Sequence, residues 1–129
     1  SLSPHQPVQK HYDTDLLDWE MKMLKEKYQI PIILLYIPTT PIIEDNIVKT
    51  KKDEFFPILQ VHVQQHDITL INMKESFEQA YQQIKQLPRG FENTSPGDGH
   101  INELGHQLVA EELTKALTKI LQKERDNAF

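Results

Sequence analysis

Residues 30–38 read Ile-Pro-Ile-Ile-Leu-Leu-Tyr-Ile-Pro, and this stretch is the strongest indicator of the fold class. Pro31 ends any preceding helix and Pro38 stops the strand, because a proline cannot donate a backbone hydrogen bond. Residues 32–37 form an unbroken apolar run, with no alternation of apolar and polar side chains. Such a run is typical of a strand in a parallel sheet that helices cover on both faces. The stretch therefore predicts an α/β fold.

The segment before this strand predicts a helix over residues 15–28. Leu17, Met21, Leu24 and Tyr28 recur at the spacing of one helical face, and Asp13 offers a side-chain oxygen as N-cap. Trp19 and Met23 are interpreted as further core positions, together with Met21.

The rest of the chain alternates helical and strand patterns. After a connection over 39–52, the patterns predict a helix over 53–65, with Pro57 in its first turn, and a strand over 67–72. A helix capped by Ser76 follows and is ended by residues 88–90. A loop over 91–101 then leads to a last helix, which runs from its cap Asn102 to Gln122. Strands that alternate with helices favour a parallel sheet. The segment over 39–52 is interpreted as a long connection that could carry function. Its lysines Lys49, Lys51 and Lys52 are interpreted as a solvated loop.

The length of 129 residues corresponds to one domain or to a piece of a larger one. We expect an extended lead-in over 1–12, the α/β unit over 13–123 and a frayed tail over 124–129. Two strands make a thin sheet whose edges expose unpaired backbone groups. We therefore expect the chain to be part of a larger sheet, and to self-associate when it is isolated.

Composition and charge exclude several classes of function. The net charge is −5, whereas a nucleic-acid binder needs a basic face to meet the phosphates. The chain has no cysteine, which excludes disulfides, thiolate metal sites and a cysteine nucleophile. No segment has the roughly 18–20 consecutive apolar residues that a membrane-spanning helix needs.

The stretch most informative about chemistry is residues 97–106, Gly-Asp-Gly-His-Ile-Asn-Glu-Leu-Gly-His, which leads into the last helix. His100 could act there as a general base, and Asp98 could fix its tautomer and stabilise the imidazolium. Glycines on both sides of Asp98 permit a tight backbone turn.

This stretch, with Asp98-Gly99-His100, Asn102, Gly105-His106, Leu108 and Ala110, resembles the last conserved block of the SGNH (GDSL-type) hydrolase superfamily. The resemblance implies a partial three-layer α/β/α fold of flavodoxin-like SGNH type, with a short parallel sheet flanked by helices. It also implies that Asp98 and His100 belong to a Ser-His-Asp catalytic set for acyl ester hydrolysis. The implied substrate is a small-molecule ester, such as a lipid or an acylated sugar, and no metal or organic cofactor is implied.

The N-terminal Gly-Asp-Ser block of that family is absent. The four serines are Ser1, Ser3, Ser76 and Ser95, and none follows a Gly-Asp pair. The chain also begins without Met. We therefore expect a C-terminal segment of such a hydrolase, joined to a missing N-terminal part and inactive alone.

The sequence is also compatible with functions other than hydrolysis. The alternative function is a non-catalytic α/β binding or scaffold module that self-associates through its sheet. A flavodoxin-like regulatory domain is disfavoured, because it would contribute about five strands. His62 and His66 have the i, i+4 spacing of a zinc pair, but no metal site is expected there because no Glu lies between them. His106 is interpreted as a packing or capping residue.

Overall fold

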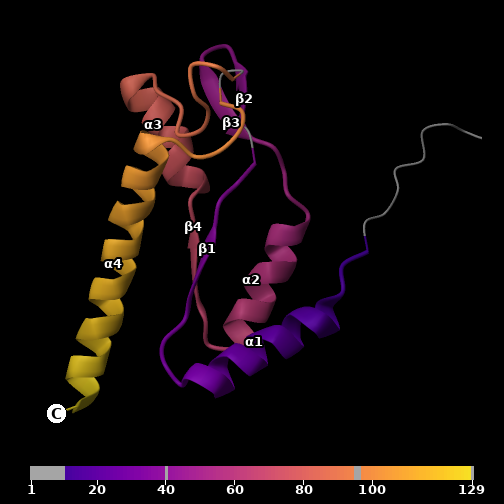
Figure 1. Ribbon diagram of the computed structural model, residues 1–129, viewed down its shortest axis with the longest axis vertical. Helices are drawn as coiled ribbons and strands as arrows, with labels where there is room; N and C mark the ends of the chain where they lie inside the picture. The colour runs from indigo at the N-terminus through magenta and orange to yellow at the C-terminus, as the bar shows by residue number, and fades with distance from the viewer. Residues whose placement is uncertain (1–10, 40, 95–96, 129) are drawn as a thin grey trace, which may run out of the picture.

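The computed structural model describes residues 11–39, 41–94 and 97–128, and these form a mixed α/β structure (Figure 1). The expected lead-in over 1–12 lies almost wholly outside the described residues. The elements in chain order are α1 (Thr14–Tyr28), β1 (Ile33–Tyr36), β2 (Pro41–Glu44), β3 (Ile47–Thr50), α2 (Phe55–Gln65), β4 (Thr69–Asn72), α3 (Lys74–Ile84) and α4 (Glu103–Ala128).

The centre of the fold is a parallel pair of strands, β1 and β4. Ile33 lies opposite Thr69 and Tyr36 lies opposite Asn72. The amide of Thr69 donates to the Ile32 carbonyl at 3.0 Å, and the amide of Met73 donates to the Tyr36 carbonyl at 3.0 Å, so the ladder extends beyond both ends of the strands. The parallel pairing predicted from the sequence is confirmed.

Two hydrophobic clusters use alternate residues of these strands. Ile32, Leu34 and Tyr36 pack with α1 and α2 around buried Met21, Leu59, Val63 and Ile68. Ile33, Leu35 and Ile37 pack instead with α3 and α4 around buried Ile71, Met73, Phe77 and Val109. Successive side chains of a strand point to opposite faces, so the unbroken apolar run supplies both clusters.

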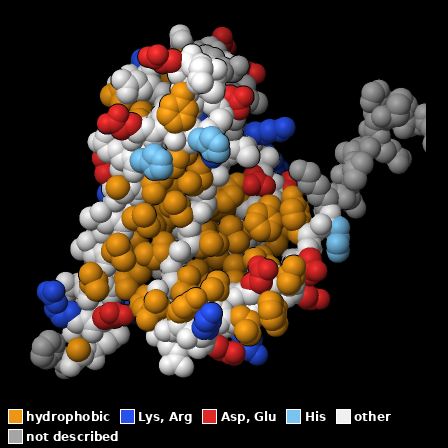
Figure 2. Space-filling view, in the orientation of Figure 1, with side chains coloured by type: hydrophobic (Ala, Val, Ile, Leu, Met, Phe, Trp, Pro, Cys, Tyr) orange, Lys and Arg blue, Asp and Glu red, His pale blue; other side chains and the backbone are white. Residues whose placement is uncertain are grey.

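The helices lie on two sides of the strand pair. In Figure 1, α4 runs along one side of β1 and β4, while α2 and α1 lie on the other. Figure 2 shows a broad hydrophobic surface over the strands, between α4 and α2. Within the described residues the pair has no third strand, so apolar groups remain open to solvent along it.

Helix α1 lies where the sequence predicted a helix, but two of the residues expected in the core are not buried. Asp13 accepts a hydrogen bond from the Leu16 amide at 2.9 Å and is the N-cap that the sequence predicted. Met21 is 4% exposed, whereas Trp19 is 58% and Met23 is 45% exposed. At about 100° per residue, Trp19 and Met23 project away from the side of the helix that carries Met21. The interpretation of Trp19 and Met23 as core residues was wrong.

The segment over 39–52, expected to be a long connection, contains an antiparallel hairpin, β2–β3, while its lysines Lys49, Lys51 and Lys52 are exposed as expected. Its two-residue turn is Asp45-Asn46, with φ of 50° and 62°. Positive φ at both positions is the geometry of a type I′ turn, for which Asp and Asn are favoured residues. Val48 of β3 is 4% exposed, and β3 packs against α3. The connection is therefore ordered by its turn and by one buried side chain.

The ends of two helices differ from expectation. Asn72 Oδ1 accepts from the Lys74 amide at 3.0 Å, so α3 begins at Lys74 and Ser76 lies inside its first turn. Ser76 is thus not the cap that the sequence predicted. Helix α4 continues to Ala128, through residues assigned to a frayed tail, with a Gln122–Asp126 hydrogen bond at 3.0 Å. Most residues in that segment are good helix formers.

The hairpin turn gives a test of the fold. Asn46→Gly should raise the free energy of unfolding by about 0.5 kcal/mol, because glycine adopts positive φ without a steric penalty. Asn46→Val should lower it by roughly 1–2 kcal/mol, because a β-branched residue is strained there. Urea denaturation measures both. Asn93→Val is the control, since Asn93 is exposed and lacks a positive φ, and it should change stability little. Equal stability of the two Asn46 variants would contradict the turn.

Candidate functional site

The predicted catalytic stretch is held in a compact loop that joins α3 to α4. Residues Arg89 and Ile101 pair as an antiparallel bridge. The Gly90 amide donates to the His100 carbonyl at 3.0 Å, and the Asn102 amide donates to the Pro88 carbonyl at 3.0 Å. The backbone on both sides of the loop is therefore fixed.

Asn102 is the polar centre of this loop. Its Nδ2 donates to the carbonyls of Leu87 at 2.8 Å and Gly90 at 3.1 Å. Its Oδ1 accepts from the Gly105 amide at 3.1 Å, in the first turn of α4. The N-cap predicted from the sequence is confirmed, and the same side chain also fastens the segment that leaves α3.

Two glycines allow these segments to approach each other. Gly90 has a φ of +92°, and a Cβ there would lie 2.9 Å from the Asp98 carbonyl oxygen. A Cβ on Gly105 would lie 2.3 Å from the Pro88 carbonyl oxygen, so α4 starts in direct contact with buried Pro88. A side chain at either position would push the loop away from its support.

Arg89 ties the loop to the central strands. Its Nε and Nη2 donate to the Pro38 carbonyl at 3.1 and 2.7 Å, and its Nη1 donates to the Gly99 carbonyl at 3.0 Å. Pro38 lies two residues after the carboxyl end of β1. Gly99, between the two predicted site residues, is therefore held just beyond that end of the parallel pair. Nothing in the sequence pattern singled out Arg89, because its partners are backbone carbonyls.

The structure places Asp98 and His100 on the same exposed turn. Asp98 Oδ1 accepts from the Gly99 amide at 2.9 Å, and the Asp98 carbonyl accepts from Thr94 Oγ1 at 3.2 Å. The His100 side chain is exposed while its backbone is paired with Gly90. The fixed backbone presents both side chains at the carboxyl end of the sheet.

Of the four serines, only Ser76 lies within the described residues. It is half-buried in the first turn of α3. Ser1, Ser3 and Ser95 lie outside the described residues, so the structure assigns no nucleophile to the turn.

A polar pair of residues also marks the carboxyl end of β1. The Tyr36 hydroxyl donates to Asp53, whose other carboxylate oxygen accepts from the Phe55 amide at 2.9 Å at the start of α2. Burial, assisted by the Asp53 carboxylate, raises the pKa of Tyr36 to about 12. Tyr36 is therefore protonated at neutral pH and acts as a hydrogen-bond donor that joins β1 to α2.

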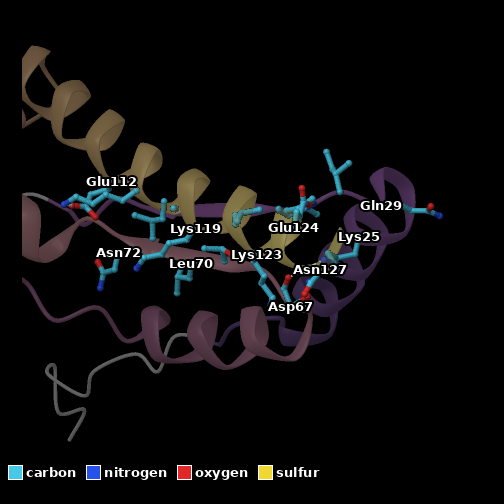
Figure 3. Close-up of a pocket in the computed structure, with 18 residues that line it drawn as sticks. Lys25, Gln29, Asp67, Leu70, Asn72, Glu112, Lys119, Lys123, Glu124 and Asn127 are labelled. Carbon is cyan, nitrogen blue, oxygen red and sulfur yellow. Dashed lines mark hydrogen bonds and ion pairs between the residues drawn. The ribbon is translucent and has the colours of Figure 1, made fainter. Parts of the chain in front are cut away.

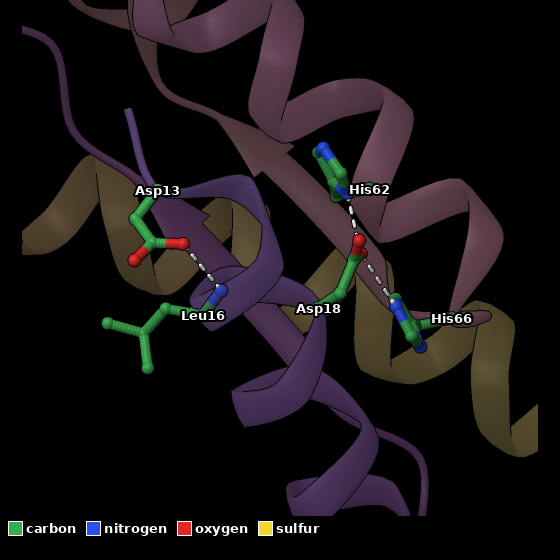
Figure 4. A network of polar contacts seen from close by, with 5 residues as sticks. All are labelled: Asp13, Leu16, Asp18, His62 and His66. Carbon is green, nitrogen blue, oxygen red and sulfur yellow. Dashed lines mark hydrogen bonds and ion pairs between the residues drawn. The ribbon is translucent and has the colours of Figure 1, made fainter. Parts of the chain in front are cut away.

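A second polar cluster joins α1 to α2 (Figure 4). Asp18 Oδ1 lies 2.5 Å from His62 Nδ1 and 3.0 Å from His66 Nε2. The hydrogen bonds from His62 and His66 lower the pKa of Asp18 below its usual value. No group of three metal-ligating side chains suited to a metal ion occurs in the described parts of the chain. We interpret the i, i+4 histidines as a helix–helix contact.

A groove lies elsewhere, along the open edge of β4 (Figure 3). It has a volume of about 810 Å³, and Leu70 and Ile120 contribute apolar surface to it. The lysines that line it are Lys25, Lys115, Lys119 and Lys123. It reaches toward Gln29 and Asp67, at the amino ends of β1 and β4, and includes no residue of the loop that carries Asp98 and His100.

The Asp18 cluster predicts a pH dependence of stability. Because the pKa of Asp18 is lowered on folding from 3.8, its stabilising contribution is complete above about pH 4 and is lost as pH falls through the lowered value. Asp18→Asn should therefore lower the urea midpoint at neutral pH, and the difference from the parent chain should shrink below pH 3.8. Asp45→Asn, in the exposed hairpin turn, is the matched control. A difference in urea midpoint between Asp18→Asn and the parent chain that stays constant from neutral pH to below pH 3.8 would contradict a stabilising role of the Asp18 carboxylate.

Comparison of the chain with known protein families, with curated proteins and with solved structures finds no match. None of the described helices is both long and apolar enough to cross a membrane.

Proposed function

We propose that this chain supplies the Asp98–His100 part of the catalytic centre of an SGNH-like acyl ester hydrolase. A serine from outside the described residues would complete the set. The proposal rests on the resemblance of residues 97–110 to the last block of that family, together with the position of the turn.

The position of the turn is the observation that carries the proposal. Arg89 holds the Gly99 carbonyl and the Pro38 carbonyl with one guanidinium group, beyond the carboxyl end of β1. In open parallel α/β sheets, ligands bind in the crevice outside the carboxyl ends of the strands. The position of His100 and Asp98 on a hydrogen-bonded turn near that edge supports a role for them in meeting a substrate.

The proposed chemistry is a two-step acyl transfer. His100 takes the proton of the serine hydroxyl as its oxygen attacks the ester carbonyl, and returns that proton to the departing alkoxide. Water then attacks the acyl-enzyme with His100 again as base, which releases the carboxylic acid and restores the serine. Asp98 orients His100 and stabilises its charged form.

The proposal also includes a partial three-layer α/β/α fold, in which the parallel sheet continues with further strands next to β1. The two edges of the strand pair differ in their surroundings. Four lysines line the groove at the β4 edge, and charged residues are a common protection of a free edge. Leu117 and Leu121 of α4 are 48% and 59% exposed and do not line that groove. We therefore propose that further strands are added at the free edge of β1.

Activity of the longer protein that the proposal requires is the direct test. His100→Ala should lower kcat for short-chain ester hydrolysis by on the order of 10³-fold or more, with Asp98→Asn costing a similar or smaller factor. His106→Ala is the matched control, because His106 is an exposed histidine in the first turn of α4, and it should leave kcat unchanged. The 129-residue chain alone should not exceed the rate of free imidazole.

Near-normal activity of both His100→Ala and Asp98→Asn in the longer protein would refute the proposed roles. Robust hydrolysis by the isolated chain that survives His100→Ala would refute both the roles and the need for an outside serine.

The open β1 edge also favours a second candidate, a non-catalytic α/β module that binds a partner or another copy through its sheet. Such a module would keep the fixed turn without using it for chemistry. The His100→Ala measurement separates the two candidates, because only the hydrolase depends on the imidazole.

A further inference from the structure

The outer edge of β4, on the side away from β1, carries backbone groups that no described residue pairs. Among the described residues β4 is hydrogen-bonded to β1 alone. The amides of Thr69 and Met73 both donate toward β1. Backbone groups along a strand alternate between its two sides with a two-residue period, so Leu70 and Asn72 direct their amides and carbonyls away from β1. This edge can therefore hydrogen-bond another extended strand.

A groove lies on each side of this edge. The groove of about 810 Å³ is on the α4 side (Figure 3). A second groove, of about 380 Å³, is on the α2 side, where Phe56 and Val63 line it. Leu70 and Asn72 line both grooves. Because successive side chains of a strand point to opposite faces, a strand added here would place alternate side chains in the two grooves.

The α2-side groove is uncharged over the part of the chain that the structure describes. Phe56, Val63 and Ile68 give it apolar surface, and its polar residues include Gln60 and Gln64. A charged side chain would lose hydration there without gaining an ion pair. This groove therefore suits apolar side chains of an added strand.

The α4-side groove is charged, and lysines outnumber carboxylates in it. Its charged residues are Lys25, Asp67, Glu112, Lys115, Lys119, Lys123 and Glu124. Near the carboxyl end of β4, Lys115 Nζ forms an ion pair with Glu112 at 3.1 Å, so these two charges cancel. Both residues also line a neighbouring groove together with Asn72, which fixes their place along the strand.

The surplus positive charge lies at Lys119. At the amino end of β4, Lys25 and Lys123 are matched in number by Asp67 and Glu124 (Figure 3). Lys119 is about 6 Å beyond Lys115 along α4, and Leu70 is about 7 Å before Asn72 along β4, so Lys119 lies beside the middle of the edge. The residues three and four positions from Lys119 on α4 are Lys115, Ala116, Gln122 and Lys123. None of them is acidic, and Lys119 has no ion pair within the described chain.

We propose that the outer edge of β4 binds an extended peptide as an added strand, with an acidic side chain beside Lys119 and apolar neighbours in the α2-side groove. Backbone bonds to Leu70 and Asn72 provide affinity, and the two grooves select the side chains. A lysine beside a free edge disfavours pairing with uncharged or basic strands and favours an acidic one. The site is separate from the proposed hydrolase centre, because neither groove includes a residue of the loop that carries Asp98 and His100.

Fluorescence anisotropy of a labelled peptide with Val-Glu-Val at its centre and two serines at each end tests the proposal. The 129-residue chain should bind it saturably. Replacing the glutamate of the peptide with lysine should weaken binding about tenfold, and Lys119→Glu in the chain should have a similar effect. The lysine peptide should bind the Lys119→Glu chain to within about threefold of the original pair, because the attraction returns with the charges exchanged.

Lys51→Glu is the matched control. Lys51 is exposed and lines neither groove, and its reversal makes the same change in net charge. This variant should bind the original peptide as the parent chain does. Equal weakening by Lys51→Glu and Lys119→Glu would overturn the assignment of the acidic side chain to Lys119.

N-methylation of alternate peptide amides tests whether the peptide adds as a strand. Only one of the two alternate sets can face β4, so methylation of that set should abolish detectable binding. Methylation of the other set should leave affinity within about threefold. Equal effects of the two sets would overturn strand addition, as would the absence of saturable binding. Peptide affinity that falls as the chain concentration rises would show that a second copy occupies the edge, and would also overturn the proposal.

Discussion

The parallel pairing of β1 with β4 is the constraint on which the other features depend. It sets Ile33 opposite Thr69 and Tyr36 opposite Asn72, so that alternate residues of one apolar run enter two different hydrophobic clusters. It also brings the carboxyl ends of both strands to one edge, where Pro38 can meet Arg89. Without this register the helices would lose their common support, and the turn that carries Asp98 and His100 would lose its fixed position.

Local hydrogen bonding then determines how that turn is presented. Asn102 satisfies two carbonyls and the first turn of α4 with one side chain, and Arg89 bonds two carbonyls from different segments. These bonds are made largely to backbone groups, and Asp98 and His100 are exposed to solvent. The proposed catalytic role and the structural role of the loop are thus carried by different residues.

Much of this structure could be predicted from the sequence where one physical signal dominates. The apolar run between Pro31 and Pro38 predicted the strand and its coverage on both faces, and Asp13 and Asn102 predicted two helix starts. Prediction failed where signals compete. Trp19 was assigned to the core because it is hydrophobic, although its position around the helix axis is opposite to that of Met21. The β2–β3 hairpin was missed because its Asp-Asn turn lacks the usual glycine. The Arg89 contacts could not be predicted from the sequence, because every residue has a backbone carbonyl and residue types therefore do not reveal the acceptors.

Amide hydrogen exchange measured by NMR tests most directly whether the strand pair fixes the turn. The amides of Thr69 and Met73 donate across the pair, and those of Gly90 and Asn102 donate within the loop. All four amides should be protected from exchange, and the two loop amides should exchange no faster than those of Thr69 and Met73 at the strand ends. Protected Thr69 and Met73 with Gly90 and Asn102 exchanging at the rate of an unstructured chain would show a loop that is not held by the sheet. That result would contradict the proposed site.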